Sequence, residues 1–178
     1  MNVTGAVLAD QFDADVTYGA KPTSRKIVHI GATSRFFRAH WADYISDLLE
    51  IDPRWGITAI ALGHSSDSYE KLQNLSSRGG AYGLMARGAG TPSYKIINAV
   101  VDNIHAPGRY DEVLSEMADP EVEIFSMTIT DPGYCRNRDS KTPVLDRNDA
   151  QIIHDLADLK ATNNDPRLIA QPKSAIGL

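Results

Sequence analysis

The sequence holds one cysteine, no long apolar run and no cluster of basic residues. The lone Cys135 excludes an intrachain disulfide and a cysteine-based metal cluster, which fits a reducing cytoplasm. No apolar run approaches the roughly 20 residues of a membrane helix, and no basic segment followed by an apolar core opens the chain. We therefore expect neither export nor membrane insertion. Lysine and arginine (18) are outnumbered by aspartate and glutamate (23), which argues against a nucleic-acid partner.

What remains is the composition of a soluble globular protein, with 42% hydrophobic residues in a chain of 178. A chain of this length buries most of its surface in one core, so we expect a single domain. Residues 1–24 mix acidic and small side chains without a sustained period, which predicts a leader or arm. The domain then occupies residues 25–178.

Short apolar runs alternate with helical patterns along this domain. The runs at 26–30 and 56–62 each end at a glycine, which is typical of strands buried on both faces of a parallel sheet. Between them a helix is predicted over 36–49. Its large apolar side chains recur at steps of three and four and predict one buried stripe: Phe37, Trp41, Tyr44, Ile45, Leu48 and Leu49.

The same pattern continues to the end of the chain. Further strands are predicted at 81–86, 94–101 and 123–130, and further helices after the polar segment 65–68, over 109–117 and over 148–159. Strands that alternate with helices imply right-handed crossovers. The predicted fold class is α/β, an open and mostly parallel sheet with helices on both faces.

The turn after the first strand is the first candidate site. It runs from Gly31 into the helix, and a helix N-terminus at the carboxyl end of a parallel strand presents free N–H groups to a phosphate. Thr33, Ser34 and Arg35 add hydroxyl and guanidinium donors. The turn has only one glycine, where a dinucleotide fingerprint needs more. Nucleotide binding and an ordinary strand-to-helix turn both remain open.

Asp67 is the second candidate, because it follows the second strand. A carboxylate there accepts hydrogen bonds from the ribose hydroxyls of an adenosine and repels a 2′-phosphate. The alternative is that Asp67 caps the next helix. His40 on the first helix is favoured as a packed structural residue. No histidine pair has metal-ligand spacing with a third partner, so no metal site is predicted.

Thr130 and Asp131 are the third candidate, at another strand end of the same sheet. Asp131 is a candidate for proton relay, and the alternative is a turn-forming aspartate before Pro132. Cys135 has no evident activating base, and no activated serine, cysteine or lysine stands in a recognisable setting. The residues alone therefore name no catalytic group.

Taken together, these segments resemble the N-terminal domain of the long-chain mannitol dehydrogenase family, which includes mannitol 2-dehydrogenase and fructuronate reductase. The resemblance is carried in order by segments 27–31 (IVHIG), 36–40 (FFRAH), 55–57 (WGI), 128–134 (TITDPGY), 145–149 (LDRND), 154–157 (HDLA) and 174–177 (SAIG). It implies a Rossmann-like domain that binds NAD or NADP and a separate, mostly helical substrate domain. The implied reaction is hydride transfer, without a metal, between nicotinamide and a sugar alcohol or keto sugar.

The resemblance also assigns roles to single residues. Gly31 corresponds to the first glycine of the family's phosphate turn, Arg38 belongs to its Arg-Ala-His motif, and Asp67 lies near its acidic selector for NAD. Thr130 and Asp131 match a Thr-Glu pair near the active-site channel. The expected cofactor-binding residues are Gly31, Thr33, Ser34, Arg35, Phe36, Arg38, Asp67 and Thr130, with NAD expected over NADP and Asp131 as an auxiliary catalytic residue.

This chain departs from the family pattern at three points. Thr33 stands where a second glycine is usual, and the segment leading to Arg-Ala-His is one residue longer than the commonest form. Asp131 replaces the usual glutamate, which shortens the reach of that carboxylate. The family's catalytic lysine, with its asparagine and histidine partners, comes from a C-terminal domain that we expect to be absent from this chain.

Three hypotheses follow. The chain is the nucleotide-binding portion of an NAD(P)-dependent polyol or hexuronate oxidoreductase, which needs the missing C-terminal domain or a partner that supplies it. Alternatively it is a non-catalytic fragment or interaction module that keeps the fold and weak dinucleotide affinity. The third hypothesis is a flavodoxin-like domain without a nucleotide role.

Overall fold

The computed structural model describes residues 23–87, 91–165 and 172–174. The leader predicted for 1–24 lies outside them except for its last two residues. Four strands form a parallel sheet in the order β5-β2-β1-β6: β1 (Arg25–Ile30), β2 (Trp55–Ala61), β5 (Val100–His105) and β6 (Val122–Met127). The predicted α/β class with a mostly parallel sheet is confirmed.

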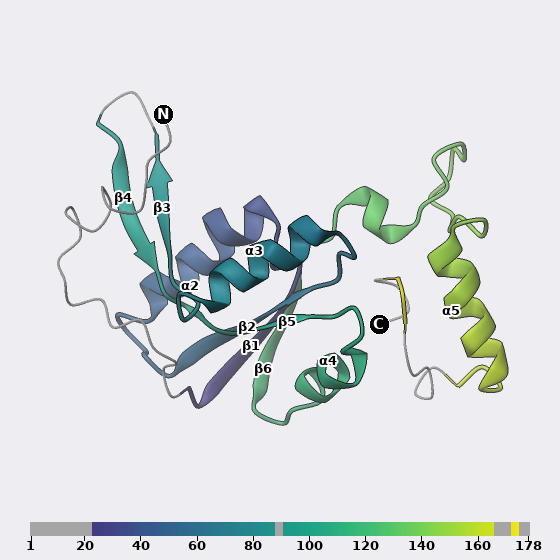
Figure 1. Ribbon diagram of the computed structural model, residues 1–178, viewed down its shortest axis with the longest axis horizontal. Helices are drawn as coiled ribbons and strands as arrows, with labels where there is room; N and C mark the ends of the chain where they lie inside the picture. Colours follow the sequence, from purple (N-terminus) through teal and green to yellow (C-terminus); the bar gives the residue numbers. More distant parts are fainter. Residues whose placement is uncertain (1–22, 88–90, 166–171, 175–178) are drawn as a thin grey trace.

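Helices cover both faces of this sheet (Figure 1). On one face lie the π-helix η1 (Phe37–Trp41), α2 (Ala42–Leu48) and α3 (Ser66–Ser76), and on the other lies α4 (Tyr110–Met117). The strand side chains alternate between two apolar clusters, because successive residues of a strand point to opposite faces. Ile27 and Ile57 pack with Phe37 on the first face, and Val28 packs with Val113 on the second.

The segment predicted as one strand over 94–101 is two strands, and that prediction is wrong. β4 (Ser93–Ile97) pairs antiparallel with β3 (Tyr82–Ala86) in a separate hairpin, and β5 begins only at Val100. The chain changes direction at residues 98–99, between β4 and β5. Both strands are apolar, so hydrophobicity alone does not reveal the break between them. Residues 88–90, between the two strands of this hairpin, lie outside the described residues.

The first helix opens with a π-helical turn that shifts its buried face. The backbone N–H of Ala42 donates to the carbonyl of Phe37, five residues earlier, and both side chains are fully buried. Tyr44, predicted on the buried stripe, is 60% exposed, because the stripe follows a spacing of five where we assumed steps of three and four.

Beyond β6 the chain forms the short helix η2 (Asp131–Tyr134) and then α5 (Ala150–Ala161), which lies apart from the sheet in Figure 1. The side chain of Asp149 caps α5 by accepting from the N–H of Gln151. Ile152 is buried, but Ile153, predicted on the same apolar side, is 54% exposed. In the described part of the chain, no helix is long and apolar enough to cross a membrane.

Candidate functional site

The turn at Gly31 joins the carboxyl end of β1 to the first helix. Gly31 has φ +113°, and a Cβ added there would lie 2.5 Å from Oγ1 and 2.6 Å from the carbonyl oxygen of Thr128. The turn therefore packs directly on the end of β6, and only glycine fits at this position. The carbonyl of Gly31 accepts from the N–H of Ser34 at 2.9 Å, which closes the turn.

Ser34 begins the helix that follows. Its Oγ accepts from the N–H of Phe37 at 3.0 Å, which is the bond of an N-cap serine. The N–H groups of Arg35 and Phe36 belong to the first helical turn and have no acceptors within the helix. At the start of a helix, the positive end of the helix dipole favours an anion.

A row of hydrogen-bonded side chains supports the turn from below. His29 contacts Ser126 Oγ through Nδ1 at 2.9 Å and Thr128 Oγ1 through Nε2 at 3.0 Å, and Thr128 Oγ1 lies 2.8 Å from Ser34 Oγ. The His29 ring also stacks on Phe37, with ring centroids 4.3 Å apart. Neither His29 nor Thr128 was singled out from the sequence. The two residues are brought together by the pairing of β1 with β6, and no local sequence pattern predicts that pairing.

Burial lowers the pKa of His29 to about 4, since its ring is only 1% exposed. The unfolded chain binds a proton at this histidine near pH 6.5, whereas the folded chain does so only near pH 4. The free energy of unfolding therefore falls as the pH drops from about 6.5 to 4, by at most about 3 kcal/mol from this group. Urea unfolding at several pH values should show a shallower acid loss for His29→Gln than for the unmutated chain. The exposed His40→Gln serves as control, and equal slopes for all three proteins would contradict the assignment.

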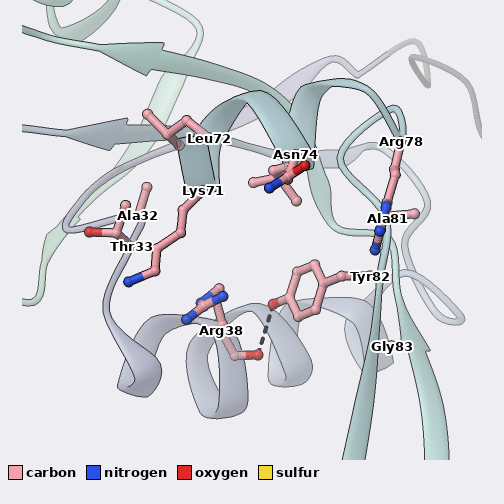
Figure 2. Close-up of a pocket in the computed structure, with 11 residues that line it drawn as sticks. Ala32, Thr33, Arg38, Lys71, Leu72, Asn74, Arg78, Ala81, Tyr82 and Gly83 are labelled. Carbon is pink, nitrogen blue, oxygen red and sulfur yellow. Dashed lines mark hydrogen bonds between the residues drawn. The ribbon is translucent and has the colours of Figure 1, made fainter. Parts of the chain in front are cut away.

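The predicted cofactor residues occupy three distinct positions around the turn. Thr33 and Ser34 are half-buried in the turn itself, and Arg35 and Phe36 are exposed on the first helical turn. Arg38 lies one turn further along the helix. Its side chain enters a cavity of about 240 Å³ between the first helix, α3 and β3. Figure 2 shows Arg38 and Lys71 reaching into this cavity from facing helices.

Tyr82 of β3 anchors the first helix beside this cavity. Its hydroxyl donates to the backbone carbonyl of Arg38 at 2.8 Å, the contact drawn in Figure 2. Burial raises the pKa of Tyr82 well above its usual value, so its phenol stays neutral and keeps this bond. The hairpin thus forms a wall of the cavity.

Asp67 lies in the first turn of α3 and is not the helix cap. Ser65 caps α3, because its side chain accepts from the N–H of Ser68 at 3.2 Å. The Asp67 carboxylate is 72% exposed and forms an ion pair with Lys71, one turn along the helix, at 2.6 Å. The capping alternative is therefore wrong. The contact of Asp67 with a ribose stays a prediction, and in this structure the same carboxylate forms an ion pair with Lys71.

Thr130 and Asp131 follow β6, which ends at Met127, three residues earlier than predicted. Thr130 is exposed, and its carbonyl accepts from the N–H of Gly133 at 2.7 Å. Asp131 opens η2, and its auxiliary catalytic role stays a prediction. The residue of this segment that contacts the turn is Thr128. Cys135 is buried, and its burial raises the pKa of the thiol, which keeps it protonated.

A parallel sheet whose first strand ends in a capped, glycine-closed turn is typical of doubly wound α/β folds, to which the Rossmann type belongs. No protein-family profile matches this sequence. It is 34% identical to a polyol:NADP oxidoreductase of Gluconobacter oxydans (strain 621H) over 151 residues, which are 84% of this chain and 29% of that protein. It is 35% identical to a D-mannonate oxidoreductase of Escherichia coli (strain K12) over 154 residues, or 85% of this chain and 29% of that protein.

Solved structures agree with these relatives. A D-sorbitol dehydrogenase in substrate-free form matches 90% of this chain and 31% of its own, with TM-score 0.72 and 32% identity. The mannitol 2-dehydrogenase of Pseudomonas fluorescens, solved with NAD and D-mannitol, matches 94% and 32% with TM-score 0.72 and 28% identity. The chain is thus similar to the N-terminal part of mannitol, mannonate and polyol oxidoreductases, and it spans about 30% of the length of these proteins. The resemblance predicted from the motifs is confirmed.

Proposed function

We propose that this chain is the dinucleotide-binding part of an NAD(P)-dependent oxidoreductase that interconverts a sugar alcohol and a keto sugar. The observation that carries the proposal is the Gly31 turn, closed on β6 and leading into a helix capped by Ser34. The donor set suits a phosphate-bearing cofactor, since it combines helical N–H groups, hydroxyls and guanidinium groups. A bound nicotinamide supplies the hydride acceptor or donor.

The residues of the chain then have separate tasks. The N–H groups of Arg35 and Phe36 and the Thr33 hydroxyl bind the pyrophosphate. Thr130 and Asp131 border the nicotinamide side at the carboxyl end of β6. The network from His29 through Thr128 to Ser34 positions the turn. The proton of the alcohol needs a base outside this set, which the family resemblance places in a C-terminal domain.

A fluorescence titration of the full chain with NADH and NADPH tests this proposal. We expect binding in the micromolar to millimolar range, without turnover of mannitol or fructose by the chain alone. Ser34→Ala should weaken binding about fivefold, because the cap and the contact with Thr128 are lost together, a cost of about 1 kcal/mol. Ser140→Ala, which removes a hydroxyl that contacts Thr142, is the matched control. If neither NADH nor NADPH binds at millimolar concentration, the proposed function is wrong.

The second candidate is a non-catalytic module that acts only with a partner. The chain spans 29% of each of the two curated oxidoreductases. Addition of a separately produced C-terminal portion of such a relative distinguishes the two. Restored turnover supports the enzyme, and dinucleotide binding that never leads to turnover supports the module.

A further inference from the structure

The hydrogen-bonded row beneath the turn has more protons than contacts to use them. Three contacts join its side chains in a line, from Ser126 through His29 and Thr128 to Ser34, at 2.9, 3.0 and 2.8 Å. Near neutral pH the ring of His29 is uncharged, since burial lowers its pKa to about 4, and it carries one N–H. Each of the three hydroxyls adds one proton. Three contacts use three of these four protons, so one is left for a partner outside the row.

The tautomer of His29 decides which end of the row keeps that proton. With the ring proton on Nε2, His29 donates to Thr128, and Thr128 donates to Ser34. Ser126 then donates to Nδ1, and the proton of the Ser34 hydroxyl is free. With the ring proton on Nδ1, every bond reverses and the free proton is at Ser126. Thr128 Oγ1 also lies 3.5 Å from the carbonyl oxygen of Gly31, a contact too long to compete with the one at 2.8 Å.

The two ends of the row have different surroundings. Ser34 Oγ accepts from the N–H of Phe37, and its second lone pair is available to Thr128. Ser34 is half-buried at the start of the first helix, where free N–H groups and the helix dipole favour an anion. Ser126 lies within β6, and among the described residues its Oγ has no hydrogen-bond partner besides His29. An anionic acceptor therefore meets the row at Ser34.

We infer that His29 carries its proton on Nε2 when the pyrophosphate of a dinucleotide is bound at the turn, so that Thr128 donates to Ser34 and the Ser34 hydroxyl donates to the anion. The inference rests on the proposed dinucleotide site and deepens it. His29 is a positioning residue, because its ring is 1% exposed and acts on the anion only through Thr128 and Ser34. Stacking on Phe37 keeps the ring in place. A hydrogen bond to a charged phosphate is stronger than one between neutral groups, so the bound anion favours this tautomer.

Long-range ¹H–¹⁵N correlation of the histidine rings in the full chain identifies the tautomer. NADH and inorganic pyrophosphate are the two probes, at neutral pH, and His29→Gln assigns the His29 signals by their loss. We expect a protonated Nε2 and an unprotonated Nδ1 in the complex with either probe. A ring that carries its proton on Nδ1 in the complex overturns the inference. This measurement uses the unmutated chain and decides the matter even where a variant does not fold.

The affinity for NADH tests the row independently. Thr128→Val keeps the size of the side chain and removes the hydroxyl, so it should weaken binding about fivefold, whereas Thr128→Ser should stay within about twofold. In a Ser34→Ala background, Thr128→Val should change the affinity by less than about twofold, because the two hydroxyls act as one unit. The matched control is Thr162→Val, which removes a hydroxyl that donates to backbone carbonyls of α5. Equal losses with and without the Ser34 hydroxyl overturn the inference.

The possible results separate this inference from the proposed function. NADH that binds with the ring proton on Nδ1, or with independent losses at Thr128 and Ser34, overturns the inference and leaves the dinucleotide site standing. If NADH, NADPH and pyrophosphate all fail to bind, the proposed function fails and the inference fails with it. Circular dichroism of each variant shows whether the fold is kept.

Discussion

Gly31→Ala is expected to lower the free energy of unfolding by about 3 kcal/mol and to abolish dinucleotide binding. The backbone at Gly31 has φ +113°, which an alanine adopts only under strain. The new methyl group would also overlap Oγ1 and the carbonyl oxygen of Thr128, at 2.5 and 2.6 Å. The carbonyl belongs to the end of β6 and cannot rotate away. Urea unfolding followed by circular dichroism measures the loss.

Gly108→Ala is the matched control for this substitution. Gly108 also has a positive φ, +78°, but nothing lies within 4 Å of an added Cβ. Its replacement should cost only the backbone strain, about 1 kcal/mol, and leave dinucleotide binding intact. Equal losses for the two variants would show that the contact between the turn and β6 does not control the site.

Asp155→Asn is expected to lower the free energy of unfolding by about 2 kcal/mol and to release residues 172–174 from α5. The Asp155 carboxylate is buried and accepts from the N–H groups of Lys173 and Ser174 and from the Ser174 hydroxyl, at 2.8, 2.9 and 2.5 Å. An asparagine turns one acceptor oxygen into a donor that faces other donors. Hydrogen exchange of the Lys173 and Ser174 amides measures the release, and Asp158→Asn on the same helix is the control.

This carboxylate also gives the contact a pH dependence. Burial alone would raise the pKa of Asp155, but the hydrogen bonds from Ser174 and Lys173 outweigh it and hold the pKa below its usual value. A group whose folded pKa is lowered stabilises the fold above its unfolded pKa, near 3.9. Protection of the Ser174 amide should therefore be constant from pH 8 to 5 and decrease below about pH 4. Protection that stays unchanged at pH 3 would contradict this role.

The central sheet could be predicted from the sequence because its strands are short apolar runs that end in glycine or polar turns. A short, continuous apolar run such as 26–30 or 56–62 is typical of a strand that is buried on both faces of a parallel sheet. The hairpin escaped prediction, because β4 and β5 form nearly continuous apolar sequence and only their pairing partners differ. The π-turn was not predicted, because helices are recognised by apolar residues that repeat every three or four positions, and this turn has a spacing of five.

The candidate site could be predicted in part. Gly31 and Ser34 stood out because they lie between a buried strand and an amphipathic helix. The contact between His29 and Thr128 joins residues 99 apart in the chain, so only strand pairing reveals it. The cavity between the first helix, α3 and β3 left little signal in the sequence, because Lys71 lies on α3 but Arg78 follows the end of that helix at Ser76. Arg38 of the first helix lines the same cavity, and the sequence alone could not place it opposite α3.

The central claim is that a dinucleotide binds at the carboxyl ends of β1 and β6, on the turn that Gly31 closes. An NMR titration of the full ¹⁵N-labelled chain with NADH and, separately, NADPH tests it most directly. The account predicts chemical-shift changes concentrated in the amides of residues 31–36 and 128–130, with those of α5 unmoved. Shifts that gather on α4 or α5, or no shifts at millimolar concentrations of either cofactor, would contradict it.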